Sequence, residues 1–332
     1  MKKTKSFFIV LFLAMATFYS GFSSANIVTQ PNSDVPDEFE ILVKYLEENA
    51  NFISNDAFPI INADEVKSNL KNPKYHVIDI RSDSWFEYGH IKGAVNLKAE
   101  DLLSYFENTI KPQEFEKIIL VCYSGQSASY YSGLLRIAGY DNVYSMKWGM
   151  SSWREDFAEN AWLKNISSSH DADMETAENP KPEVGNHPQL NTGMSEAKDI
   201  LKARLTELFK LPYSDFIIKP TDVFENSSNY FIVNYAKKEN FDLGHITGSV
   251  DYIPGASLTS TTDLYTLPMD QKIVVYGETG LKTAYVVAYL NVLGYNVGNL
   301  AYGANSFMNN KLKHDNLDAF TKKDINMYPV IE

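Results

Sequence analysis

An internal repeat is the feature that most constrains the fold of this 332-residue chain. A shift of 155 residues places the segment FEYGHIKG at 86–93 on FDLGHITG at 241–248. The same shift places the apolar run at 117–121 on the run at 272–276. A register shared by glycines and apolar runs over this length indicates two copies of one domain.

Each copy alternates short apolar runs with amphipathic stretches, a pattern typical of parallel α/β folds. In the first copy we expect strands at 76–80 and 118–122 and helices at 63–70 and 128–137. The predicted fold class is α/β, with two tandem domains that each contain a mainly parallel sheet flanked by helices. Ligand sites of such sheets lie at the carboxyl ends of the strands, where helices begin.

The predicted organisation of the chain has six parts. In order they are a signal peptide (1–25), an extension with a helix at 37–49 (26–57), the first domain (58–164), a linker (165–193), a helix (194–214) and the second domain (215–330). The linker is rich in Ser, Asp, Glu and Pro without an apolar period, so we expect it to be flexible. Its histidines, His170 and His187, are expected to be solvated rather than to bind metal.

The N-terminus has the pattern of an export signal. Lys2, Lys3 and Lys5 precede an apolar run at 7–18, and small residues follow ahead of Asn26. The run is too short to span a bilayer comfortably. We therefore predict cleavage before Asn26, a periplasmic or secreted protein, and no membrane association after cleavage.

Charge and cysteine content exclude several functions. The chain carries 30 basic and 42 acidic residues, a net charge of -12, which opposes binding to nucleic acid. Cys122 is the only cysteine, so an intrachain disulfide, a two-cysteine redox pair and thiolate-rich metal sites are excluded. We expect no metal and no cofactor.

Cys122 lies where a predicted strand passes into a predicted helix. If the short loop that follows it curls around the sulfur, backbone N–H groups and the helix N-terminus form a nest that favours a thiolate or a persulfide anion. The candidate substrate-binding residues are Tyr123, Ser124, Gly125, Gln126, Ser127 and Ala128. This hypothesis requires that the amides point at the sulfur and that the sulfur is accessible.

These residues resemble the rhodanese-like sulfurtransferases. The resemblance rests on Asp79-Ile80-Arg81, on GHIKGA at 89–94, on the six-residue loop at 122–127, and on Gly149 with Trp153. It implies that Cys122 takes a sulfur atom from a small donor, becomes a persulfide, and passes the sulfur to a thiophilic acceptor, which includes the possibility of a protein acceptor. Related phosphatases and arsenate reductases use a longer loop that ends in arginine.

The loop carries no basic residue that would hold the sulfonate group of thiosulfate. Polysulfide or a small persulfide is therefore the preferred donor. Lys147, shortly before Gly149, is a candidate to replace part of the missing charge, and a solvated lysine is the alternative.

The second copy has Gly277 in place of Cys122 and so has no nucleophile. We expect it to be a packing partner, with a pocket-covering or regulatory role as the alternative. His90 matches His245 of the second copy, which favours a structural hydrogen bond over a catalytic role. Asp79 and Arg81 either orient the site or form a local ion pair.

Three functions remain open at this point. The first is an exported sulfurtransferase, and the second is a noncatalytic sulfur carrier or binding module. The third, a phosphatase or arsenate reductase, is disfavoured by the length of the loop and by Ser127 in its last position.

Overall fold

The computed structural model describes residues 37–49, 53–54 and 56–332. The predicted signal peptide lies outside these residues. Across the described ranges, no helix is long and apolar enough to cross a membrane.

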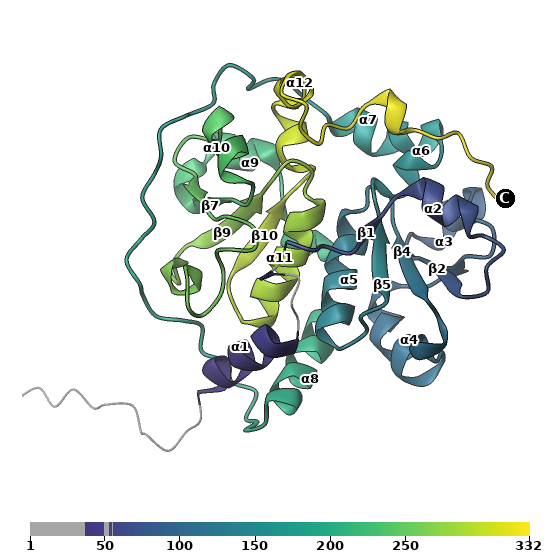
Figure 1. Ribbon diagram of the computed structural model, residues 1–332, viewed down its shortest axis with the longest axis horizontal. Helices are drawn as coiled ribbons and strands as arrows, with labels where there is room; N and C mark the ends of the chain where they lie inside the picture. The colour runs from purple at the N-terminus through teal and green to yellow at the C-terminus, as the bar shows by residue number, and fades with distance from the viewer. Residues whose placement is uncertain (1–36, 50–52, 55) are drawn as a thin grey trace, which may run out of the picture. The chain divides into compact units, whose positions relative to one another are not determined.

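Two five-stranded parallel sheets form the two halves of the chain, as the repeat predicts (Figure 1). The first has the order β1-β5-β4-β2-β3, and the second repeats it as β6-β10-β9-β7-β8. The strands of the first sheet are β1 (Ile60–Ile61), β2 (Tyr75–Asp79), β3 (Val95–Asn96), β4 (Lys117–Val121) and β5 (Val143–Met146). Those of the second are β6 (Ile217–Ile218), β7 (Tyr230–Asn234), β8 (Val250–Asp251), β9 (Lys272–Tyr276) and β10 (Val297–Leu300).

Helices flank both sheets. In the first half they are α2 (Ala63–Ser68), α3 (Asp83–Tyr88), α4 (Leu102–Asn108), α5 (Gln126–Ile137), α6 (Glu155–Asn160) and α7 (Trp162–Asn165). In the second half they are α9 (Pro220–Glu225), α10 (Lys238–Leu243), α11 (Leu281–Val292) and α12 (Asn309–His314). Two more helices, α1 (Glu38–Asn49) and α8 (Ala197–Leu208), pack on each other. The predicted fold class is thus confirmed, and the strands and helices predicted for the first copy lie within about two residues of the observed ones. The helix expected at 194–214 is shorter, since α8 ends at Leu208 and a separate 3-10 turn begins at Tyr213.

Alternation along the central strand β4 explains its burial on both faces. Ile118 and Leu120 point into one apolar cluster, and Ile119 and Val121 point into another. The first cluster is shared by the two halves, because α5 and α11 lie side by side (Figure 1). Gly133 allows this close packing, since an added Cβ would lie 3.0 Å from the Cβ of Ala288.

The linker after α7 is held against the second half rather than free, which differs from the expectation of flexibility. Ser167 N donates to Asn305 O at 3.0 Å, and Gly185 N donates to Tyr265 O at 2.8 Å. His170 stacks on Phe224 with ring centroids 3.8 Å apart. The segment follows the outside of the second half in Figure 1, so backbone hydrogen bonds and ring stacking replace the apolar period that its sequence lacks.

The C-terminal end of the linker is hydrogen-bonded to α1 through one carboxylate. Glu38 accepts hydrogen bonds from Thr192 N, Thr192 Oγ1 and Gly193 N, each at 2.8 Å. Burial alone would raise the pKa of Glu38, but these hydrogen bonds together lower it. His187 is also engaged here, because its ring stacks on Phe39 at 4.3 Å and its Nε2 lies 3.1 Å from an oxygen of Asp37.

The last residues of the chain return to the first half. Tyr328 N donates to Trp153 O at 2.7 Å, and the indole N–H of Trp153 donates to Pro329 O at 3.0 Å. His90 and Ile331 exchange two backbone hydrogen bonds of 2.9 Å. The tail therefore closes the side of the first sheet that carries Trp153.

Asp251→Asn is expected to stabilise the protein at neutral pH. Asp251 on β8 pairs in register with Asn234 on β7, and the Oδ1 atoms of both have no hydrogen-bond partner among the residues that the structure places. Burial is the main cause that raises the pKa of Asp251 above its ordinary value of 3.8, although Lys238 and Lys181 oppose it. The carboxylate form is therefore disfavoured in the folded state, and stability falls as the pH rises through the folded-state pKa.

The variant should gain on the order of 1 kcal/mol in unfolding free energy near pH 8, the scale of one unsatisfied buried polar group. This gain should shrink as the pH is lowered to about 4, because the raised pKa leaves more of the Asp251 carboxyl protonated in the folded than in the unfolded chain. Urea unfolding at both pH values measures it, with Asp270→Asn on the exposed surface as the matched control. A gain of equal size at both pH values would contradict the explanation.

Candidate functional site

Cys122 is the first residue after β4 and lies at the carboxyl end of the first sheet, as predicted. Gly125, at a φ of 89°, turns the chain back so that α5 begins beside the sulfur. Two backbone N–H groups then donate to Cys122 Sγ, from Gly125 at 3.1 Å and from Ala128 at 3.4 Å. The amides therefore point at the sulfur, which meets one of the two requirements of the sequence-based hypothesis.

The carbonyl groups of the loop are satisfied from outside. Cys122 O accepts from Met150 N at 2.9 Å, Tyr123 O from Ser151 Oγ at 3.1 Å, and Ser124 O from the indole N–H of Trp162 at 2.9 Å. Since the carbonyl oxygens are held outward, the N–H groups are left facing the sulfur. This is the geometry of an anion-binding nest.

Gly149 makes room for this loop. Its φ is 56°, and an added Cβ would lie 2.4 Å from Cys122 O and 2.6 Å from Gly125 N. A side chain at this position would therefore push directly on the backbone that surrounds the sulfur.

Gly149→Ala is accordingly expected to lower the unfolding free energy by about 2–4 kcal/mol, through steric overlap and a left-handed backbone. Gly303 provides a matched control in the second half, because its added Cβ would meet Gly277 O at the same 2.4 Å. Urea unfolding should show similar losses for both alanine variants. The sulfur loading that the family resemblance implies for Cys122, measured below the unfolding transition, should fall further in Gly149→Ala, and equal loading in the two variants would contradict this role of Gly149.

The remaining loop side chains lie around a cavity of about 590 Å³. Its lining comprises Trp85, Tyr123, Ser124, Gln126, Ser127, Asn160, Ala161, Tyr213, Ser214, Ile217, Ala301 and Tyr302. Four of the predicted substrate-binding residues thus border one cavity, and Gly125 and Ala128 contribute their amides beneath it. Lys147 is not among the lining residues, because its Nζ pairs with Asp318 at 2.7 Å and lies 4.8 Å from the ring centroid of Trp148.

The sulfur itself is covered, so the second requirement, accessibility, is not met in this conformation. Cys122 is 1% exposed. Two tyrosines of the second half lie close enough to interact with it electrostatically. The pKa of Tyr302 is raised to about 12, mainly by burial and additionally by the nearby Cys122. The pKa of Tyr213 is also raised, again mainly by burial and to a smaller extent by Cys122.

Gln126, at the start of α5, connects the two halves. Its side chain donates to Ser124 Oγ at 3.1 Å and accepts from Tyr302 N at 2.8 Å. The loop of the second half approaches from the other side, where a Cβ added to Gly125 would lie 2.9 Å from a methyl group of Leu281. The second half is therefore part of the wall around Cys122, which the sequence gives as the alternative role for this copy.

The second half repeats the loop without its nucleophile. Gly280 has a φ of 72°, and Tyr302 and Gly303 keep the left-handed conformations of Trp148 and Gly149. A Cβ added to Gly277 would lie 2.9 Å from Tyr235 O. A backbone carbonyl thus occupies the space that a cysteine side chain would need.

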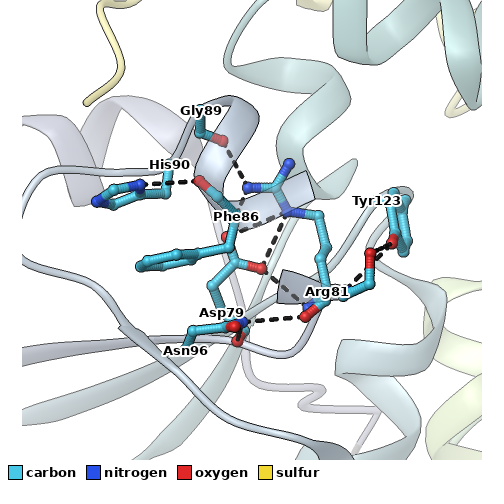
Figure 2. Close-up of polar contacts among 8 residues, drawn as sticks. Asp79, Arg81, Phe86, Gly89, His90, Asn96 and Tyr123 are labelled. Atoms are coloured by element: carbon cyan, nitrogen blue, oxygen red, sulfur yellow. Dashed lines mark hydrogen bonds and ion pairs between the residues drawn. The ribbon is translucent and has the colours of Figure 1, made fainter. Parts of the chain in front are cut away.

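Asp79 and Arg81 form a buried ion pair beside the site (Figure 2). Arg81 donates to Asp79 Oδ2 at 2.7 Å and to Gly89 O at 2.7 Å. Its guanidinium also lies 6.0 Å from the ring centroid of Tyr123. The pair therefore joins the end of β2 to the GHIKGA segment and to the first loop residue after Cys122.

His90 has the structural role that its counterpart in the second copy indicates. Its Nδ1 lies 2.9 Å from Phe86 O, and its ring stacks on Phe86 at 3.8 Å (Figure 2). His245 makes the matching contacts with Phe241, at 3.0 Å and 3.6 Å. Neither histidine contacts Cys122. In the described part of the chain, no three His, Cys, Asp or Glu side chains come together as a metal site.

Tyr213 and Tyr302 are among the lining residues that sequence reasoning missed. Tyr213 begins the short 3-10 turn Tyr213–Phe216, far along the chain from Cys122. No local pattern marks either tyrosine as a neighbour of the loop. Only the position of Tyr302 before Gly303, which repeats that of Trp148 before Gly149, gave a signal.

Comparison with known proteins finds relatives of this chain. The family model described as the rhodanese-like domain matches residues 62–156 and 224–310, one match in each half. The chain is 35% identical over 79 residues to the protein named thiosulfate sulfurtransferase GlpE of Shewanella oneidensis, which covers 24% of this chain and 75% of that protein. It is 29% identical over 97 residues to the protein of the same name from Tolumonas auensis, covering 29% and 89%. Among solved structures, the crystal structure of SseA from Escherichia coli is 20% identical, covers 74% of this chain and 98% of that chain, and has a TM-score of 0.27.

Proposed function

Because the chain belongs to the rhodanese-like domain family, we propose that it is an exported sulfurtransferase that carries sulfane sulfur as a persulfide on Cys122. The observation that carries the proposal is the convergence of two backbone N–H groups on Cys122 Sγ, at 3.1 and 3.4 Å. These groups stabilise negative charge on the attacking sulfur. They are equally suited to the terminal sulfur of a persulfide.

The reaction proceeds in two displacements. The Cys122 thiolate attacks the outer sulfur of a persulfide R–S–SH, the S–S bond of the donor breaks, and R–SH leaves with the proton, so that Cys122–S–S⁻ remains. A nucleophilic acceptor then attacks the terminal sulfur. The Cys122 S–S bond breaks and the electron pair returns to Cys122 as thiolate.

The chemistry of the cavity supports a small persulfide with an uncharged substituent as donor. Among the described residues that line it, none is Asp, Glu, Lys, Arg or His. The sulfonate group of thiosulfate would lose hydration there without gaining a cation. The relatives from Shewanella and Tolumonas are named for thiosulfate, so the donor proposed for this chain differs from the one in their names.

A noncatalytic sulfur carrier is the second candidate, and the burial of Cys122 favours it. A sulfur that is 1% exposed is protected from small acceptors in solution. In a carrier, the sulfur of the persulfide would be transferred only when a partner protein displaces the residues that bury Cys122.

Turnover and mass separate the two candidates. The purified protein is incubated with polysulfide or thiosulfate and then with cyanide, and thiocyanate is measured alongside intact mass. Thiocyanate in excess over enzyme supports the sulfurtransferase, whereas the mass of one added sulfur atom without turnover supports the carrier. Absence of added sulfur with every donor would refute both. Cys122-dependent hydrolysis of an aryl phosphate would instead support the phosphatase alternative.

Export is the part of the proposal that rests on sequence alone. Residues 1–25 carry the signal pattern, and they lie outside the described residues. N-terminal sequencing of the protein from cell envelope and culture medium tests it. A mature chain that starts at Asn26 is expected, and an intact Met1 in a cytoplasmic fraction would contradict export.

A further inference from the structure

We propose that the second half builds the substrate pocket of Cys122 and selects persulfides with an uncharged apolar or aromatic substituent, with Tyr213 as the residue that sets this specificity. The inference rests on the proposed function, because it assumes that Cys122 accepts sulfur. It concerns a domain that has no nucleophile of its own, and it gives that domain a role in choosing the donor.

The walls of the cavity come from both halves. The loop after Cys122 and Trp85 form the first-half side, whereas the second half contributes Tyr213, Ser214, Ile217, Ala301 and Tyr302. Removing the second half would leave the loop open to solvent on this side. A substrate that reaches the loop therefore also contacts side chains of the second half, which the sequence repeat did not indicate as site residues.

The lining favours an uncharged organic substituent. Trp85, Tyr123, Tyr213 and Tyr302 provide aromatic surface, and Ile217 adds an aliphatic side chain. The volume of about 590 Å³ falls within the range of roughly 300–1,000 Å³ that organic ligands occupy. A small inorganic anion would fill only part of this space.

Arg81 and Lys147, two cationic side chains near the loop, are already engaged. Arg81 is bonded to Asp79 and Gly89, and Lys147 is paired with Asp318. An anionic donor would therefore enter the cavity without a counter-charge, which costs affinity.

Tyr213 separates this cavity from a second one that does contain charged residues. The second cavity, of about 430 Å³, is lined in part by Lys98, Glu100 and Lys210, and it shares only Ser127 and Tyr213 with the first. Tyr213 is buried, and its hydroxyl accepts a hydrogen bond from Asn299 Nδ2 at 2.8 Å. The side chain is thus fixed between an uncharged cavity and one bordered by lysines. Its removal would join the two.

The test compares two donors in the full-length protein, benzyl hydropersulfide and thiosulfate, with cyanide as acceptor and Cys122→Ala as blank. For the unaltered protein, kcat/KM for benzyl hydropersulfide should exceed that for thiosulfate by at least about tenfold, the scale of one apolar group in a pocket. Tyr213→Ala should lower this ratio at least about fivefold, because it opens the cavity toward Lys98 and Lys210.

Ser214→Lys keeps the inference testable if Tyr213→Ala does not fold. Ser214 is exposed and lines the cavity, so this variant adds one cation to the pocket from the second half. The ratio should fall at least about threefold through a gain with thiosulfate. Ser227→Lys places the same charge on an exposed turn before β7, outside the cavity, and should leave the ratio unchanged.

The outcomes distinguish this inference from the proposed function. If Cys122 gains sulfur but thiosulfate matches benzyl hydropersulfide, or if Ser214→Lys behaves like Ser227→Lys, the pocket assignment is wrong and the persulfide chemistry stands. If neither donor adds sulfur to Cys122, the proposed function fails and the inference fails with it.

Discussion

Cys122→Ser is expected to lower thiocyanate formation to the uncatalysed rate, a loss of at least about 10³-fold. A serine hydroxyl has no accessible anion at neutral pH and cannot form the persulfide on which both displacements depend. Since Cys122 is the only cysteine, the variant also has no thiol from which another persulfide could arise. Steady-state turnover with polysulfide and cyanide measures the loss, and intact mass should show no added sulfur.

The fold must be retained for this result to bear on chemistry. Serine is nearly isosteric with cysteine, and its Oγ is able to accept from Gly125 N and Ala128 N, so the unfolding free energy should change by less than about 1 kcal/mol. Urea unfolding checks this. Turnover within tenfold of the unaltered protein, in a folded variant, would show that sulfur transfer does not depend on Cys122.

The environment of Cys122 illustrates how much of the site the sequence predicts. The apolar run before Cys122 and the amphipathic stretch that follows predicted a strand, a short loop and a helix, and the structure contains β4, Gly125 at a positive φ, and α5 in that order. These features are local, because burial pattern and glycine conformation act over a few residues. The cradle of N–H groups follows from them almost directly.

The burial of Cys122 by residues of the second half could not be predicted in the same way. Tyr213 is far from Cys122 in the sequence. It lies beside the loop because α5 and α11 pack the two halves together. Pairwise contacts of this kind depend on tertiary packing and leave no periodic pattern in the sequence. The sequence therefore could not show whether the sulfur is accessible, and the structure was needed to test this part of the hypothesis.

A local sequence pattern can predict the start of a helix correctly although the interaction behind the pattern is absent. Asn62, with Glu65 three residues later, has the pattern of a capping box, and α2 does begin at Ala63. However, the Asn62 side chain makes no capping hydrogen bond. Glu65 instead accepts from Lys117 Nζ at 2.5 Å and from Tyr75 at 3.0 Å, so the long-range partners determine its conformation.

Asp79→Asn is expected to destabilise the protein by about 3–5 kcal/mol, the usual cost of leaving one partner of a buried ion pair unpaired. The side chains of Asp79 and Arg81 are 1% and 0% exposed, so water cannot solvate the guanidinium that remains. One nitrogen of Arg81, Nη1, already has no hydrogen-bond partner within the part of the chain that the structure describes. Loss of the carboxylate charge would therefore leave a buried cation without an anionic partner, held by Gly89 O, by aromatic rings and by the neutral amide oxygen of the new side chain.

The second half supplies a natural control for this prediction. Asn234 and Ala236 stand where the first half has Asp79 and Arg81, which shows that the same fold accommodates a neutral pair. The double variant Asp79→Asn with Arg81→Ala should therefore recover at least half of the stability lost in the single variant, because it removes the orphaned charge. Urea unfolding of the three proteins measures this coupling. Additive losses would show instead that Arg81 stabilises the loop region through its contacts with Gly89 and Phe157, independently of Asp79.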